Sequence, residues 1–129
     1  MKRLGFATAI LIAVAVSACA TAKKDLTVPG GAIAAGHTTG QVEAAIEDGL
    51  KDHRWVETGK QPGRITAKVE GIGKGHPTAT VAIVYSASTY SIEYVDSTGL
   101  SYDEKTGSIH GNYKKWTNNL RASIDKRLQ

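Results

Sequence analysis

The sequence predicts an α+β domain in which two helices cover one face of an antiparallel sheet. Residues 38–52 and 112–128 place apolar side chains at spacings of three and four, which is typical of amphipathic helices. Segments between them alternate apolar and polar residues with a period of two, as half-buried strands do. We therefore expect a two-layer sandwich in the order α-β-β-β-β-α, with three to four strands in the sheet.

The first helix is expected to begin just after Thr38. Thr38 and Gln41 have the spacing of a capping box, in which each side chain accepts a hydrogen bond from the other residue's backbone N–H. Apolar residues then recur at i, i+3, i+4, i+7 and i+8, and define one buried face. These residues are Val42, Ala45, Ile46, Gly49 and Leu50.

Strands are expected to follow this helix. Residues 54–58 form a short β-prone run, and residues 59–63 have the composition of a turn. Arg64–Glu70 alternates apolar and polar side chains and predicts a half-buried strand. Residues 71–77 are rich in glycine and predict a loop. They lack the G-x-x-x-x-G-K-[ST] pattern of a phosphate-binding loop.

Residues 78–85 and 90–95 predict a hairpin, with its turn at residues 86–89. The register that fits this turn also separates apolar from polar side chains, as expected for a real hairpin. The expected pairs are Tyr85–Tyr90, Ile83–Ile92 and Val81–Tyr94 on the buried face, and Val84–Ser91, Ala82–Glu93 and Thr80–Val95 on the other.

A turn at residues 96–99 and a short edge segment at residues 100–102 are expected before the second helix. That helix, over residues 112–128, ends in basic residues, which suit the dipole at a helix C-terminus. We expect it to lie beside the acidic first helix. Its predicted apolar stripe comprises Tyr113, Trp116, Leu120, Ile124 and Leu128.

The start of the chain is typical of an export signal. Lys2 and Arg3 give it a positive beginning, and residues 4–18 are uncharged and mostly apolar. This order is that of a signal peptide. The apolar run is shorter than the ~20 residues that span a bilayer as a helix. We therefore expect residues 1–18 to be removed.

Cys19 is the only cysteine, and it indicates how the leader is cut. Together with residues 16–18, Val-Ser-Ala, it resembles the lipobox of bacterial lipoproteins. This resemblance implies a diacylated Cys19 thiol, cleavage just before Cys19 and acylation of the new amino group. The alternative is ordinary signal peptidase cleavage at the A-x-A patterns of residues 18–20 or 20–22.

A lipid on Cys19 would hold the mature protein on a membrane. Stable anchoring takes more than one acyl chain, and the resemblance implies three. Ala20 and Thr21 follow the cysteine, and neither is the aspartate that resembles an inner-membrane retention signal. We therefore expect the protein on the periplasmic face of the outer membrane.

The chain is expected to have three parts. Residues 1–18 form the signal peptide, residues 19–36 a lipidated N-terminus and flexible tether, and residues 37–129 a single α+β domain. Loss of Lys2 and Arg3 lowers the formal net charge from +4 to +2. A charge this small, without a clustered basic face, makes nucleic acid an unexpected partner.

Three segments of the domain carry a further resemblance. They are "RITAKV" (residues 64–69), "YSIEYVDSTGLSY" (residues 90–102) and "IHGNYKKW" (residues 109–116). From Trp55 onward the chain resembles a group of small, largely uncharacterised lipoproteins of Gram-negative bacteria. This resemblance implies a compact fold with helices on an antiparallel sheet, and it implies no known activity.

Few residues have a pattern that predicts chemistry. The four histidines have no spacing typical of a metal site, so we expect no metal and no other cofactor. A Ser-His-Asp arrangement using His110 and Asp96 lacks a G-x-S-x-G motif, and we assign no catalytic residue. A weak candidate binding surface comprises Asp96, Tyr102, His110 and Tyr113.

The sequence therefore predicts a lipid-anchored envelope protein without catalytic activity, which binds a partner such as another envelope protein. One alternative is a small periplasmic hydrolase that uses His110 and Asp96. Another is a carrier in which tyrosines and tryptophans line a ligand pocket. Core packing is the more common role for such aromatic residues.

Overall fold

The structure is a computed structural model that describes residues 26–129. The predicted signal peptide and Cys19 lie outside these residues. In chain order the elements are β1 (Val28–Pro29), α1 (Thr39–Asp52), β2 (Val56–Gln61), β3 (Arg64–Glu70), β4 (Thr78–Tyr85), β5 (Tyr90–Thr98) and α2 (Gly111–Leu128).

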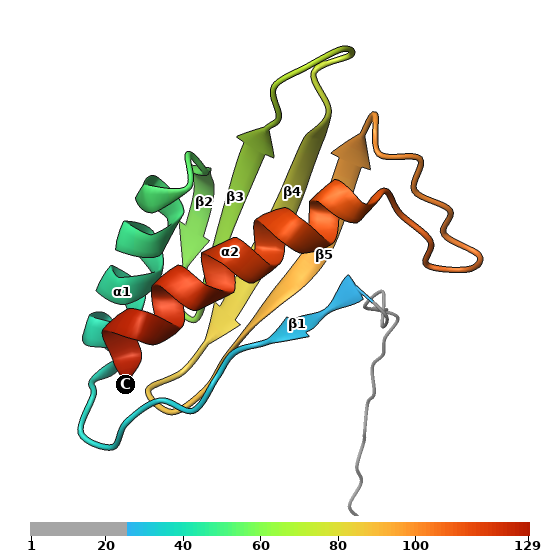
Figure 1. Ribbon diagram of the computed structural model, residues 1–129. Coiled ribbons are helices and arrows are strands. Elements are labelled where there is room, and N and C mark those ends of the chain that lie inside the picture. The colour runs from blue at the N-terminus through green and yellow to red at the C-terminus, as the bar shows by residue number, and fades with distance from the viewer. Residues whose placement is uncertain (1–25) are drawn as a thin grey trace, which may run out of the picture.

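The fold is of the α+β class, as predicted, with both helices packed on one face of an antiparallel sheet (Figure 1). The strand order is β1-β5-β4-β3-β2, and every neighbouring pair is antiparallel. The sheet has five strands, so the expected number of three to four strands was wrong. The additional strand, β1, precedes α1, and the element order begins with a strand.

β1 and its flanking residues belong to the domain rather than to a tether. Leu26 is 2% exposed and lies in the core. The backbone N–H of Gly30 donates to Tyr90 O, and that of Gly31 donates to the Asp125 carboxylate. The ordered domain therefore begins well before residue 37. Two strand residues are too few to produce a periodic pattern, which is why the sequence did not predict them.

The predicted register of the β4–β5 hairpin is confirmed from Tyr85–Tyr90 to Val81–Tyr94. The side chains of Tyr85–Tyr90, Ile83–Ile92 and Val81–Tyr94 are buried, with Ile83 and Ile92 fully so, whereas Val84 on the other face is exposed. The predicted Thr80–Val95 pair is wrong, because a bulge after Tyr94 places Asp96 opposite Thr80. β5 then continues to Thr98 through the segment predicted as a turn.

β3 spans Arg64–Glu70 as predicted, with Ile65, Ala67 and Val69 buried. β2 is longer than expected, because it continues to Gln61 through residues predicted as a turn. Residues 100–102 form no strand, although Leu100 is buried.

Each helix begins at a side-chain cap. The capping box predicted at α1 is confirmed: Thr38 Oγ1 accepts from Gln41 N at 3.1 Å, and Gln41 Oε1 accepts from Thr38 N at 2.9 Å. At α2 the cap is His110, whose Nδ1 accepts from Asn112 N at 3.1 Å.

The buried stripe of α2 contains four of the five predicted residues and also the polar residues Thr117 and Ser123. Thr117 is fully buried and Trp116 only half-buried. The Thr117 hydroxyl donates to Tyr113 O at 3.0 Å, so its burial leaves the hydroxyl satisfied. Trp116 consequently lies at the side of the helix, where it contacts the loop between β3 and β4.

The two helices lie side by side, but only one ion pair joins them within residues 26–129. Asp52 of α1 accepts from Arg127 Nη2 at 2.8 Å and from Ser123 Oγ at 2.6 Å. These bonds hold the pKa of Asp52 below its usual value, the Ser123 hydroxyl more strongly than the Arg127 guanidinium. We expected the acidic side chains of α1 to lie along the basic side chains of α2. In residues 26–129 only Asp52 and Arg127 form such a pair.

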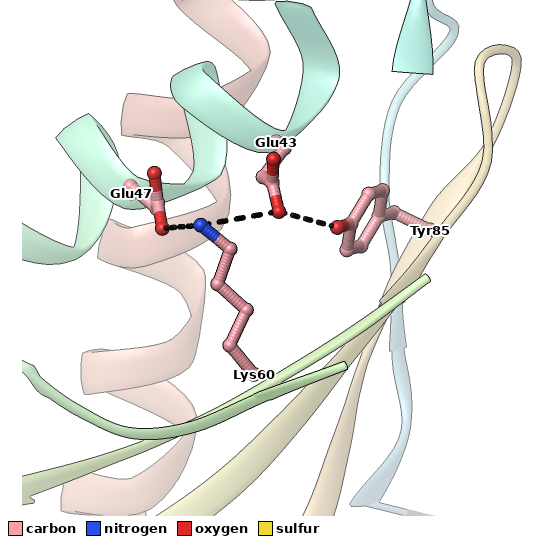
Figure 2. A network of polar contacts seen from close by, with 4 residues as sticks. All are labelled: Glu43, Glu47, Lys60 and Tyr85. Atoms are coloured by element: carbon pink, nitrogen blue, oxygen red, sulfur yellow. Dashed lines mark hydrogen bonds and ion pairs between the residues drawn. The ribbon is translucent and has the colours of Figure 1, made fainter. Parts of the chain in front are cut away.

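Two other acidic residues of α1, Glu43 and Glu47, bind the sheet instead (Figure 2). Lys60 of β2 lies 3.0 Å from Glu47 Oε2 and 3.3 Å from Glu43 Oε2. The Tyr85 hydroxyl donates to the same Glu43 oxygen at 3.0 Å. Hydrogen bonding to Lys60 is the main reason that the pKa of Glu47 is lowered. This network ties α1 to β2 and β4.

Candidate binding cleft

The residues of the predicted binding surface do not form one site. The rings of Tyr102 and Tyr113 both pack on Tyr94, with ring centroids 4.5 Å and 5.5 Å from it. Tyr113 is fully buried, and its burial raises the pKa of its hydroxyl. Tyr113 is therefore part of the core, and Tyr102 packs against that core.

His110 and Asp96 are not brought together. The Nδ1 atom of His110 is engaged in capping α2. Asp96 is an exposed residue of β5, opposite Thr80. No hydrogen bond or ion pair joins the two side chains in the described part of the chain. The pairing on which the predicted hydrolase depends is therefore absent from this arrangement.

A different set of residues surrounds a cavity of about 310 Å³. We call it the Trp116 cleft and define it by residues 53–55, residues 69–72, Asn112, Trp116 and Asn119. Residues 53–55 follow α1, and residues 69–72 run from the end of β3 into the β3–β4 loop. Figure 1 shows that the end of α1 and this loop lie at the same end of the sheet. Three segments distant in sequence therefore meet here.

The first wall depends on how α1 ends. Arg54 has φ of +64°, in the left-handed region that is uncommon for any residue except glycine. This conformation reverses the chain, and Trp55 N donates to Leu50 O at 2.9 Å. Trp55 is then buried, at 4% exposed, whereas Arg54 remains exposed beside the cleft. Strained backbone of this kind is often found at functional sites.

The second wall is the β3–β4 loop. Gly71 N donates to Pro77 O at 2.7 Å and closes the base of the loop. Ile72 extends into solvent and is 88% exposed, the most exposed large apolar side chain among residues 26–129. A single exposed apolar residue is ordinary on a protein surface, but this one borders a cavity.

The third wall is a stripe on α2. Asn112, Trp116 and Asn119 follow the spacing i, i+4 and i+7 and therefore share one side of the helix. This stripe lies next to the buried one. The sequence interpretation placed Trp116 in the core and gave no binding role to Asn112 or Asn119. An Asn-Trp-Asn pattern at helical spacing was the available signal.

The aromatic lining of the cleft differs from the one considered for a ligand carrier. Both tryptophans of the chain, Trp55 and Trp116, line it, and none of the five tyrosines does. Of those tyrosines, Tyr85, Tyr90, Tyr94 and Tyr113 are buried in the core. The cavity is therefore built on tryptophan, amide and charged side chains.

The charges around the cleft nearly balance. Arg54 contributes a guanidinium, and Glu70 contributes a carboxylate. Glu70 Oε2 also lies 3.8 Å from Nδ1 of the exposed His76. His53 adds an imidazole on the side of Arg54. The cleft thus contains charged groups but has no strong charge of either sign.

Neither the models of protein families nor the curated proteins include a match to this chain. From residue 26 onward, no helix combines the length and apolar character needed to cross a membrane. The same residues contain no group of three or more His, Cys, Asp or Glu side chains placed to hold a metal ion.

Proposed function

We propose that this protein is a lipid-anchored binding module of the cell envelope, which holds part of another envelope component in the Trp116 cleft. The lipobox at residues 16–19 supports the anchor, and the outer membrane, on its periplasmic face, is its proposed place. The single observation that supports binding is the cleft itself, where both tryptophans, two amides and a strained Arg54 meet.

Binding without catalysis agrees better with the residues of the cleft. Its lining includes His53 and Glu70, which are potential acid–base groups, but no serine, threonine or cysteine that would serve as a nucleophile. The alternative based on His110 and Asp96 requires the imidazole to leave its capping position. We therefore rank a hydrolase below a binding module.

An enclosing carrier also agrees less well with the cleft. A carrier buries most of its ligand's surface. The cleft is bordered by the exposed Ile72 and the half-buried Trp116. Such a lining faces solvent and favours capture of one unit of a larger molecule. The proposal therefore commits to recognition of a surface-attached or polymeric component.

The anchor is tested by the N-terminus of the protein purified from its host. Diacylglyceryl transfer requires the Cys19 thiol, so Cys19→Ser should abolish lipidation although serine is nearly the same size. Mass spectrometry of the wild type should show an acylated Cys19 with Lys2 and Arg3 removed. An unmodified N-terminus at Thr21 or Lys23 would instead identify a soluble exported domain.

The cleft is tested in living cells with a photo-crosslinking amino acid at position 119. Position 118 is the matched control, because Asn118 neighbours Asn119 on α2 but does not line the cleft. Adducts of any mass should form at 119 and be largely absent at 118. Equal crosslinking at the two positions, or none at either, would refute the cleft as the binding site.

A further inference from the structure

We infer that the Trp116 cleft recognises a neutral saccharide unit, one ring of an envelope glycan. This inference rests on the proposed function as a binding module and specifies the chemical class of its ligand. It depends on four features of the cleft: a partly exposed indole, unpaired amides, balanced charge and a small volume.

The indole of Trp116 provides a flat apolar surface at the edge of the cleft. One edge of its six-membered ring lies against Gly71, and the side chain as a whole is half-buried. Ile72 supplies a second apolar contact from the loop. A pyranose ring has an apolar face of C–H groups and a rim of hydroxyls, and it therefore matches a surface that is apolar at its centre and polar around it.

The amides of Asn112 and Asn119 are available to such a ligand. Neither side-chain amide forms a hydrogen bond with any other residue that the structure describes; the bond between Asn112 and His110 uses the Asn112 backbone N–H. An asparagine amide both donates and accepts hydrogen bonds. A hydroxyl group does the same, so two amides on either side of an indole suit a ligand rich in hydroxyls.

The charge of the cleft disfavours an ionic ligand. A phosphate or carboxylate would gain from Arg54 but would be repelled by Glu70, and a cationic ligand would meet the reverse. Both charged side chains can instead hydrogen-bond to hydroxyls. A neutral polar ligand satisfies both of them at once.

Volume and backbone geometry disfavour a peptide. About 310 Å³ is at the lower end of the range for small-molecule pockets. A peptide that adds a strand to a sheet binds through main-chain hydrogen bonds along a free strand edge. In this wall Val69 and Glu70 pair with β4, and the pairing of β3 with β2 ends at Lys68, so the open edge is only two residues long. Gly71 N, which follows them, is bonded to Pro77 O. We therefore expect side chains, and not main-chain groups, to bind the ligand in the cleft.

Tryptophan fluorescence tests the inference directly, because the only two tryptophans of the chain both line the cleft. The mature lipidated protein is purified in a polyoxyethylene detergent, which avoids sugar headgroups. It is titrated with the trimer of N-acetylglucosamine, with cellotriose and with a neutral polar tripeptide. A saturable change in emission with either saccharide, and none with the tripeptide, is expected.

Paired variants give the control. Asn119→Ala should weaken saccharide binding about fivefold, the factor equivalent to one hydrogen bond of about 1 kcal/mol. Asn118→Ala, one residue away and outside the cleft, should bind like the wild type. Both positions are exposed, so the melting temperature of each variant should remain that of the wild type.

The outcomes separate this inference from the proposed function. Saturation by the tripeptide alone, or equal weakening by the two alanine variants, would overturn the saccharide assignment while a binding cleft remained. Failure of all three probes together with crosslinking at position 119 in cells would also overturn the saccharide assignment alone. Failure of the probes without such crosslinking would overturn both proposals.

Discussion

The indole ring of Trp116 lies against the backbone of Gly71, so that a β-carbon built on Gly71 would come within 2.7 Å of ring atom Cζ2. The same β-carbon would lie 3.2 Å from Pro77 Cγ. Gly71 is not among the glycines with positive φ, so its role is to allow close packing. This contact joins α2 to the β3–β4 loop and fixes one corner of the cleft.

Gly71→Ala should displace the indole and lower stability by about 1–3 kcal/mol, the usual cost of overpacking. Urea unfolding measures the loss, and a shift of tryptophan emission reports the displaced ring. Gly111→Ala is the control, because a β-carbon at Gly111 meets no atom within 4 Å. Equal stability of the two variants would mean that Trp116 is not packed on Gly71.

Leu26→Ala should destabilise the domain by about 2–5 kcal/mol, since it removes a side chain that is 2% exposed from the core. Denaturant unfolding of the purified protein measures this. Ile72→Ala is the control, because Ile72 is 88% exposed and its truncation should change stability by less than about 0.5 kcal/mol. A loss below about 1 kcal/mol for Leu26→Ala would show that residues 26–31 are part of the flexible tether and not of the packed domain.

The elements that the sequence predicted best are those with long periodic patterns or a local signal. The β4–β5 register was predictable because several apolar pairs and a turn required the same alignment. The start of α1 was predictable because both partners of its capping box, Thr38 and Gln41, lie three residues apart. Neither prediction needed knowledge of distant contacts.

The rotation of α2 could not be predicted. Trp116 and Thr117 both fit a spacing of three or four between Tyr113 and Leu120, and hydrophobicity favoured the tryptophan. The packed structure buries Thr117 instead, because its hydroxyl bonds to Tyr113 O while the larger indole contacts Gly71. Tertiary contacts decide such a choice, and a single-sequence pattern does not contain them.

The cleft was hidden for a related reason. Its residues come from the end of α1, the β3–β4 loop and one side of α2, which only the fold brings together. β1 was missed because its pairing with β5 depends on residues more than sixty positions away. Local signals in the sequence predicted most of the helices and strands. They did not predict which segments come together to form the cleft.

Tyr90→Phe should reduce the loss of stability at alkaline pH. Burial is the main reason that the pKa of Tyr90 is raised in the folded state. The second reason is the neighbouring Asp125 carboxylate, which accepts a hydrogen bond from the Tyr90 hydroxyl. A raised pKa contributes stability that is fully present below the unfolded value of about 10 and is lost as pH rises further. Burial also raises the pKa values of Tyr85, Tyr94 and Tyr113, so the variant should retain a shallower decline.

Urea unfolding from about pH 8 to pH 11 measures that decline. At neutral pH the variant should be about 1.5–3 kcal/mol less stable, because one hydrogen bond to the charged Asp125 carboxylate is lost. Parallel stability curves for wild type and variant would show that Tyr90 titrates as it does in the unfolded chain.

Lys60→Met should raise the pKa of Glu47 toward its ordinary value, because hydrogen bonding to Lys60 is the largest cause of its depression. A depressed carboxyl pKa contributes stability above the unfolded value of about 4.3 that is lost as pH falls. The variant should therefore lose less stability between about pH 5 and pH 3. Carboxyl NMR titration measures the pKa, and Lys74→Met in the exposed loop should leave it unchanged.

Gly49→Ala should destabilise the protein, although alanine favours a helix over glycine by about 1 kcal/mol. Gly49 is buried where α1 meets α2, and an added β-carbon would lie 2.7 Å from Ile124 Cγ1. Overpacking of about 1–3 kcal/mol should outweigh the gain in propensity. Gly40→Ala in the same helix has only Thr38 Oγ1 near it, at 3.9 Å, and should instead stabilise the protein. Equal stabilisation of both variants in urea unfolding would refute close contact between the two helices at this point.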